Sequence, residues 1–172
     1  MLDVTIAATG ERFGRPPLIR LLVTVTAINS SSETRWILIS SALGPGGRGG
    51  GVDKVERLSV GGITIGRFLG TGGFYAMALR PGARLTIKNL EIAWWNDPEA
   101  STPPPIDVRI AGDVTLGGAA IATWFEADAS VAGNVEIDAA LAIHTSSRHG
   151  PGGGEVAVDL IDGRIVNVPI AR

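Results

Sequence analysis

The chain has 172 residues, of which 45% are hydrophobic and 19% are charged, and its formal net charge is -2. This length suits one domain with a sizeable core. The low charge argues against a surface that coats DNA or RNA, which needs clustered positive charge. The chain has no cysteine, which excludes disulfides, thiolate metal sites and thiol nucleophiles.

The first ten residues have neither the basic start nor the long apolar run of a signal peptide. No apolar run approaches the roughly 18 residues that a membrane-spanning helix needs. We therefore expect no transmembrane segment and a cytoplasmic location, with secretion after processing as the alternative. The preference for arginine over lysine, with abundant Ala and Gly, is associated with GC-rich bacterial genomes.

Glycine and proline occur throughout the chain. The 24 glycines and 10 prolines leave few stretches long enough for a helix, and the stretches between them are rich in Val, Ile and Thr, which favour strands. Apolar and polar residues alternate in residues 2–6 and most clearly in residues 19–27. Each stretch predicts a strand with one buried face.

Residues 35–40 return as the next strand after a polar turn at residues 28–34, and the two strands are predicted to pair antiparallel. The sequence of strand, polar turn and a strand beginning Arg35-Trp36 resembles the B–C region of immunoglobulin-like domains, without the cysteine pair of antibody domains. The resemblance implies that Trp36 is a core tryptophan.

Glycines saturate residues 43–53, which predicts a loop. The segment lacks the Gly-Lys-Ser/Thr of a P-loop and has no strand–helix unit around it. An alternative interpretation is an anion-binding nest in which the guanidinium of Arg48 contacts the anion. Residues 56–68 then give two short apolar pieces around a pair of glycines at 61–62.

Residues 74–87 predict a hairpin, because Pro81 fixes φ at the second position of a turn and Gly82 supplies the positive φ of the third. Beyond the turn, Leu85 and Ile87 occupy odd positions, whereas the next apolar residues occupy even ones. This change of parity predicts a bulge or a tight bend at residues 88–89.

Trp94 and Trp95 are neighbours, and neighbouring side chains in a strand point to opposite faces. By parity Trp94 belongs to the core, whereas Trp95 shares a face with Glu91 and precedes a proline-rich loop. An exposed tryptophan beside amide and carboxylate groups suits sugar or protein binding. The candidate ligand-binding residues are therefore Trp95, Asn96, Asp97 and Glu91. The alternative is that Trp95 packs under the loop.

The second half of the chain continues the pattern. Residues 106–112 predict a strand, and residues 110–116 resemble residues 131–137, an echo that favours a β-solenoid as an alternative fold. Residues 119–129 have helical spacing and predict one short helix. A strand at 134–143, a glycine-rich loop at 144–155 and a hairpin around 162–163 complete the chain.

The residues that carry chemistry form no recognised constellation. His144 and His149 are five residues apart, and a metal site would need carboxylates such as Asp138 or Glu155 in addition. A serine near His144 lacks the Gly-x-Ser-x-Gly elbow of a nucleophile. We therefore expect no metal and no cofactor, and we assign no catalytic residue.

About ten to twelve short strands with these turn signals predict an all-β chain. The expected fold is one antiparallel two-sheet β-sandwich over residues 1–172, immunoglobulin-like or jelly-roll in topology, with at most one short helix. The leading functional hypothesis is a non-catalytic structural or binding module that forms homo-oligomers or binds a protein partner, since low charge and many edge strands favour assembly. The alternatives are a glycan- or small-ligand-binding sandwich using Trp95 and an enzyme using His144 or an interior carboxylate.

Overall fold

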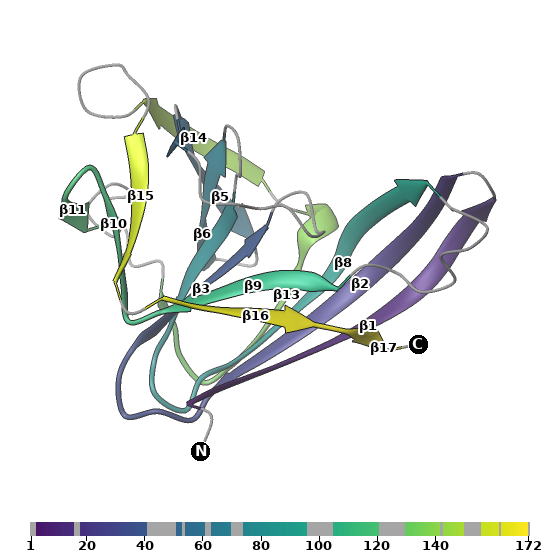
Figure 1. Cartoon of the computed structure of the whole chain (residues 1–172), viewed down its shortest axis with the longest axis horizontal. Helices are drawn as coiled ribbons and strands as arrows, with labels where there is room; N and C mark the ends of the chain where they lie inside the picture. Colours follow the sequence, from purple (N-terminus) through teal and green to yellow (C-terminus); the bar gives the residue numbers. More distant parts are fainter. Residues whose placement is uncertain are drawn as a thin grey trace.

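In the computed structural model the chain is built almost entirely of β-strands (Figure 1). The structure describes residues 3–15, 18–40, 51–52, 54–60, 63–69, 74–95, 105–120, 130–141, 143–149, 156–161 and 163–171. The one helical element in these ranges is a 3-10 turn, η1 (Ala139–Leu141). The predicted all-β class is confirmed.

Sheet A has the strand order β13-β8-β2-β1-β17. These strands are β1 (Val4–Arg15), β2 (Leu18–Asn29), β8 (Arg84–Trp95), β13 (Asn134–Asp138) and β17 (Ile170–Ala171). The first two form a 12-residue antiparallel hairpin, while β13 and β17 pair in parallel with their neighbours. Sheet A is therefore three long antiparallel strands with a short parallel strand on each side.

Sheet B has the order β14-β5-β6-β7-β3-β9-β16, and β12 also pairs with β7. Its strands are β3 (Arg35–Ser40), β5 (Lys54–Val60), β6 (Ile63–Leu69), β7 (Phe74–Leu79), β9 (Ile106–Ala111), β12 (Ser130–Val131), β14 (Ile143–His149) and β16 (Arg164–Val168). A small sheet C has the order β11-β10-β15-β4, made of β4 (Gly51–Val52), β10 (Asp113–Leu116), β11 (Ala119–Ala120) and β15 (Val156–Ile161). The structure thus has three sheets, where the sequence predicted two.

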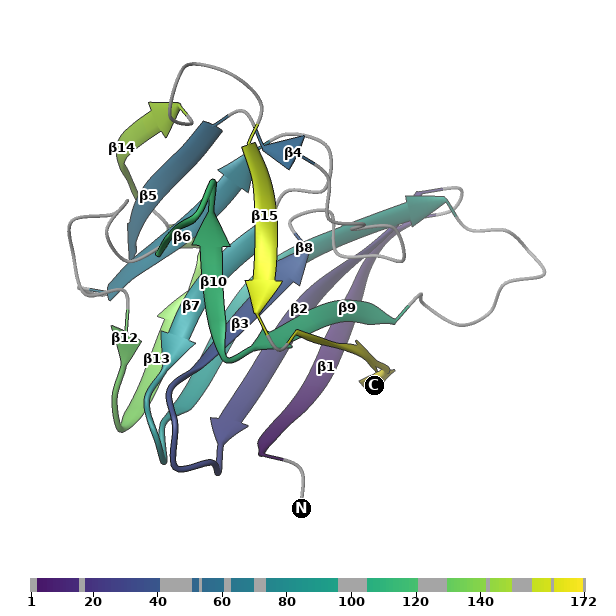
Figure 2. The ribbon, with the colours of Figure 1, turned by 60° about the vertical axis from the view of Figure 1, so that its left-hand side comes forward.

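Sheet B is the central layer, and the strands of the other two sheets lie on its two sides (Figure 2). In β3, Ile37 and Ile39 join the large core shared with sheet A, whereas Trp36 and Leu38 join a smaller core shared with sheet C. Successive side chains of a strand point to opposite faces, so both faces of sheet B are buried at β3. The expectation of a strand with one solvated face is wrong for this central strand.

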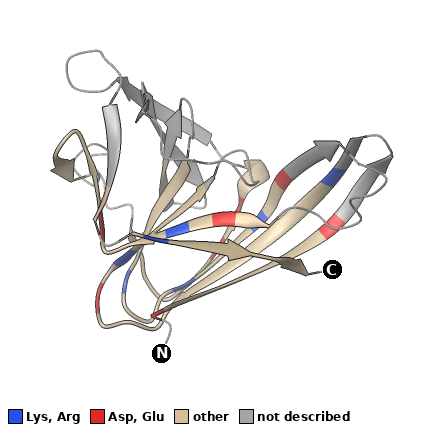
Figure 3. Cartoon of the chain, viewed as in Figure 1, with Lys and Arg blue, Asp and Glu red and all other residues tan. Residues whose placement is uncertain are grey.

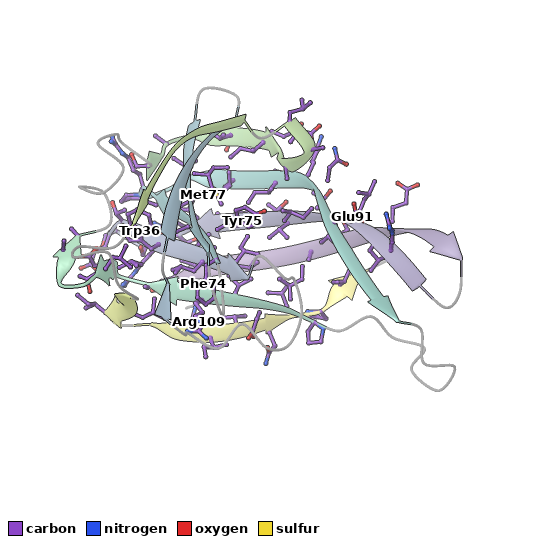
Figure 4. The ribbon with its side chains drawn as sticks, turned by 90° about the horizontal axis from the view of Figure 1, so that it is seen from above. Trp36, Phe74, Tyr75, Met77, Glu91 and Arg109 are labelled. Carbon is purple, nitrogen blue, oxygen red and sulfur yellow. The ribbon has the colours of Figure 1, made fainter. Side chains whose placement is uncertain are left out.

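Trp36 is a core tryptophan as predicted, with 6% of its surface exposed. It packs in the smaller core with Phe74 and Leu116. Arg109 lies on the neighbouring strand β9, and its guanidinium carbon is 4.9 Å from the centre of the Phe74 ring (Figure 4). A cation over an aromatic face is attracted to its quadrupole, so Arg109 adds to the packing of the central sheet.

Three turns predicted as hairpins are instead corners between sheets. The chain passes from β2 in sheet A to β3 in sheet B, from β7 in sheet B to β8 in sheet A, and from β15 in sheet C to β16 in sheet B. The turn at Pro81–Gly82 itself is confirmed, because Gly82 has a φ of 73° and the amide of Ala83 donates to the carbonyl of Arg80 at 3.0 Å. The turn at Pro81–Gly82 was predicted correctly, and the strand partners at the three corners were not.

The segments around residue 140 also differ from the prediction. The strand expected at residues 134–143 ends at Asp138, and η1 separates it from β14. Part of the loop expected at 144–155 is β14, which pairs with β5. The two short apolar pieces on either side of residues 61–62 are β5 and β6, which pair antiparallel. The helix expected at 119–129 falls mainly on residues outside the described ranges, as does most of the loop at 43–53.

The repeated segments turn out to be corners that leave sheet B. Gly112 lies between β9 and β10, which enters sheet C, and Gly133 lies between β12 and β13, which enters sheet A. The two copies therefore go to opposite sides of the central layer. They do not stack on each other as the coils of a solenoid would.

Candidate functional site

The sequence predicted an irregularity at residues 88–89, and the structure has a β-bulge there. The residues of β2 that pair with Ile87 and Leu90 are only two positions apart, so Lys88 and Asn89 together oppose the single residue Thr24. Ile87 and Leu90 are both buried in the large core. The extra residue is what allows apolar side chains of odd and even parity to enter the same core.

Asn89 adopts a left-handed backbone conformation with a φ of 59°, which asparagine tolerates better than most residues. Its side-chain amide donates a hydrogen bond to Oδ1 of Asp138 at 2.9 Å. The same oxygen accepts a hydrogen bond from the backbone amide of Ala140 at 3.0 Å. Asp138 therefore holds the bulge of β8 and the first turn of η1 together.

A groove of about 310 Å³ lies at this junction, and we call it the β8 groove. It is lined by residues of β2, β7, β8 and η1, namely Leu22, Tyr75, Asn89, Leu90, Glu91, Ala139 and Ala140. The groove begins where β13 ends, because Asp138 is the last residue of β13 to pair with β8. Figure 4 labels Tyr75 and Glu91 and shows β8 changing direction close to Glu91.

The charges around the groove are largely compensated. Glu91 pairs with Arg20 at 3.2 Å, and both side chains are about half exposed. Lys88 pairs with Glu136 at 2.7 Å. Figure 3 shows acidic and basic residues interspersed along the described strands. The groove thus has polar groups but no concentrated charge of one sign.

Two exposed leucines accompany the groove. Leu22, with 37% of its surface exposed, lines it, and Leu141, with 68% exposed, ends η1 next to Ala140. The other large apolar residues found exposed in the described part of the chain are Ile161 and Ile165, on β15 and β16. An exposed apolar side chain beside a concavity is a common feature of binding surfaces.

Of the four predicted ligand-binding residues, the structure places Glu91 in the groove. The backbone of Trp95 ends β8 opposite Leu18, four residues along the strand from Glu91 and therefore about 13 Å away. The side chain of Trp95 lies outside the described side chains, and Asn96, Asp97 and the proposed anion contact Arg48 lie outside the described residues.

The structure adds little to the enzymatic alternative. The backbone of His144 lies in β14 opposite Leu58, beside an irregularity in the pairing, and its side chain lies outside those described. Over the described residues, no group of three or more His, Cys, Asp or Glu side chains is placed to hold a metal ion.

Sequence reasoning missed most of the groove. Tyr75 comes from β7, Leu22 from β2 and the two alanines from η1, and nothing in the local sequence of each segment shows that they meet. The one available signal was the change of parity at residues 88–89, which marked the place where β8 is irregular.

No family model, curated protein or solved structure matches the chain. Within the described part of the chain, no helix has the length and hydrophobicity required to cross a bilayer. We therefore infer function from the geometry of the β8 groove and its surroundings.

Proposed function

We propose that this chain is a non-catalytic binding module that self-associates and that the β8 groove with Leu22 and Leu141 is its contact surface. The observation that carries the proposal is the exposure of Leu141 on the turn that forms one wall of the groove. Protein interfaces typically combine exposed apolar side chains with a neighbouring pocket that excludes water.

Electrostatics supports the same surface. The Arg20–Glu91 and Lys88–Glu136 pairs compensate four of the charges near the groove, so a second copy meets little repulsion there. The predicted sandwich architecture is part of this proposal, with sheets A and B as its two facing layers. The predicted cytoplasmic location stays an expectation from the sequence.

The proposal is tested by measuring the mass of the chain in solution by light scattering, between about 1 and 300 µM, the range over which weak association appears. We expect the mass to rise with concentration. Leu141→Ser should weaken association at least tenfold, a change of about 1.4 kcal/mol, because it removes an apolar contact. The matched control is Ile165→Ser, which changes an exposed residue of β16 and should leave association unchanged.

Two results would contradict this proposal. A constant monomer mass over the whole range would remove self-association. Equal weakening by Leu141→Ser and Ile165→Ser would show that the β8 groove is not the specific contact.

A second candidate function is the binding of a small polar ligand such as a glycan. It is supported by the groove volume of about 310 Å³ and by Asn89 and Glu91 in its lining, because ligand pockets combine this size with a few polar groups. Titration of a glycan panel, followed by tryptophan fluorescence, tests it. Binding that is lost in Glu91→Gln would support this candidate, and unchanged spectra across the panel would remove it.

A further inference from the structure

The outer strand of sheet A, β13, covers only the first part of β8. β13 pairs with β8 from Arg84 to Lys88, whereas β2 pairs with the opposite edge as far as Trp95. Among the described strands, none pairs with the outer edge of β8 beyond Lys88. Figure 1 shows this half of β8 as the border of sheet A beyond η1, and Figure 4 shows the same half from above. We call the outer edge of residues 90–95 the β8 edge.

Natural proteins usually protect free edges, because an unpaired strand can pair with another chain. The usual means are lysine, proline, charged residues or a very short strand. The β8 edge has the sequence LEIAWW, with no lysine, no proline and one charge. Its aromatic and β-branched residues also favour strand pairing.

The other described sheet edges are better protected. The outer strand β14 has the sequence IHTSSRH, and β16 carries Arg164 and Asn167. The remaining border strands β4, β11 and β17 have two residues each. Beyond β17, the uncovered part of β1 has the sequence GERFGR, which carries three charges. Beyond β4, the uncovered part of β15 is only four residues long. The β8 edge is therefore the longest apolar edge that the described part of the chain presents.

We propose that two copies of this chain pair through their β8 edges, as antiparallel strands related by a twofold axis. This inference rests on the proposed self-association and specifies how it occurs. Antiparallel pairing of a strand with its own copy satisfies twofold symmetry, because each copy offers the same edge. The β8 edge also overlaps the groove, whose lining includes Leu90 and Glu91.

The sequence limits the register of this pairing. An axis at Glu91 would place two carboxylates opposite each other, which is unfavourable, and would pair few residues. An axis at Ala93 pairs residues 91–95 of one copy with 95–91 of the other and places Glu91 opposite Trp95. Pro98 follows three residues after Trp95, and proline cannot donate a ladder hydrogen bond. The added ladder would thus end near Glu91, close to where β13 begins to occupy the edge.

Cysteine cross-linking of the full chain tests the geometry, because the natural sequence has no cysteine. In the proposed register the two copies of Ala93 lie directly opposite each other on adjacent strands and point to the same face, so their cysteine variants are within reach of a disulfide. We expect Ala93→Cys to form a covalent dimer under mild oxidation at least about tenfold faster than Ile165→Cys, the control on an edge that is not proposed to pair.

A pair of proline variants provides the second test. Successive residues of an antiparallel strand direct their backbone N–H groups to opposite edges. Of Ile92→Pro and Ala93→Pro, one therefore removes a donor to β2 and the other removes a donor on the β8 edge. We expect one variant to have a lowered melting temperature, and the other to keep its melting temperature at low concentration and to lose dimerisation.

The outcomes separate this inference from the proposed function. Dimers that cross-link through Ala93→Cys and are lost in one folded proline variant support both. Dimers that persist in both folded proline variants, or cross-link equally well through Ile165→Cys, overturn edge pairing and leave self-association standing. A chain that stays monomeric at all concentrations overturns both.

Discussion

Asn29 is the one polar residue found fully buried in the described part of the chain, with 0% of its surface exposed. Its amide nitrogen donates to the carbonyls of Glu33 and Leu79, at 2.8 and 2.9 Å. Its Oδ1 accepts from the backbone amide and the hydroxyl of Ser31, at 3.0 and 2.7 Å. One side chain therefore joins two corners, the one from β2 to β3 and the one from β7 to β8.

Replacing Asn29 with leucine should lower the free energy of unfolding by about 3 kcal/mol, because the buried carbonyl of Leu79, the partly buried carbonyl of Glu33 and the Ser31 donors lose their partner. Urea unfolding followed by tryptophan fluorescence measures this difference. The control is Asn134→Ala, which changes an exposed asparagine of β13 and should have an effect below about 0.5 kcal/mol. A loss in Asn29→Leu as small as in this control would mean that the corners are held by other contacts.

At the scale of elements, Gly10 determines how closely the C-terminal strand β17 can approach β1. A Cβ atom built on Gly10 would lie 2.7 Å from Cγ2 of Ile170, which is well inside van der Waals contact. β17 pairs with β1 over only two residue pairs, Ala8 with Ile170 and Thr9 with Ala171. So short a strand has few other contacts that would keep it in place.

Gly10→Ala should displace β17, because its methyl group overlaps Ile170. We expect the amides of Ile170 and Ala171 to exchange hydrogen about tenfold faster. This corresponds to a loss of about 1.4 kcal/mol of local stability. The double variant Gly10→Ala with Ile170→Ala should reduce this effect, since it removes the overlapping methyl. Thr9→Ala, on the exposed face of the same strand, is the control. Unchanged exchange at β17 in Gly10→Ala would refute the close approach.

The start of β1 is held by ion pairs from sheet B. Asp3 lies 3.2 Å from the guanidinium of Arg35 and 3.4 Å from that of Arg164. Asp3→Asn should lower the free energy of unfolding by about 0.5–1 kcal/mol at low salt. The difference should shrink at about 1 M salt, because screening weakens exposed ion pairs. Glu11→Gln, an exposed acid on the same strand, is the control, and a salt-independent loss in Asp3→Asn would argue against an ionic contribution.

At the scale of the whole molecule, the central sheet divides the interior into two cores. The larger core lies between sheets A and B, and the smaller core brings Leu116 of sheet C against Trp36 and Phe74 of sheet B. Apolar burial stabilises a fold roughly in proportion to the area removed from water. Sheet C should therefore contribute to global stability despite its short strands.

Leu116→Ala tests the contribution of sheet C. Leu116 is completely buried, so its truncation should lower the free energy of unfolding by about 3 kcal/mol through lost burial and a residual cavity. Ile161→Ala changes an exposed residue of the same sheet and should have little effect. Denaturation in urea compares the two variants, and similar small losses would show that sheet C is not part of the cooperative unit.

The sequence by itself determined where most of the described strands before residue 134 occur, because burial in a strand alternates with period two and because glycine and proline restrict the backbone locally. It located the bulge at residues 88–89, the turn at Pro81–Gly82 and the buried Trp36. It also selected Glu91, the one candidate binding residue whose described side chain lines the groove.

Only the tertiary structure decided which strands pair. A turn such as residues 80–83 joins a hairpin or a corner with the same local residues, and the choice depends on which distant surfaces are available to cover each face. The same reason explains the groove, whose walls come from four elements brought together by packing. Local backbone preferences act within a few residues, whereas strand partners are selected by burial across the whole chain.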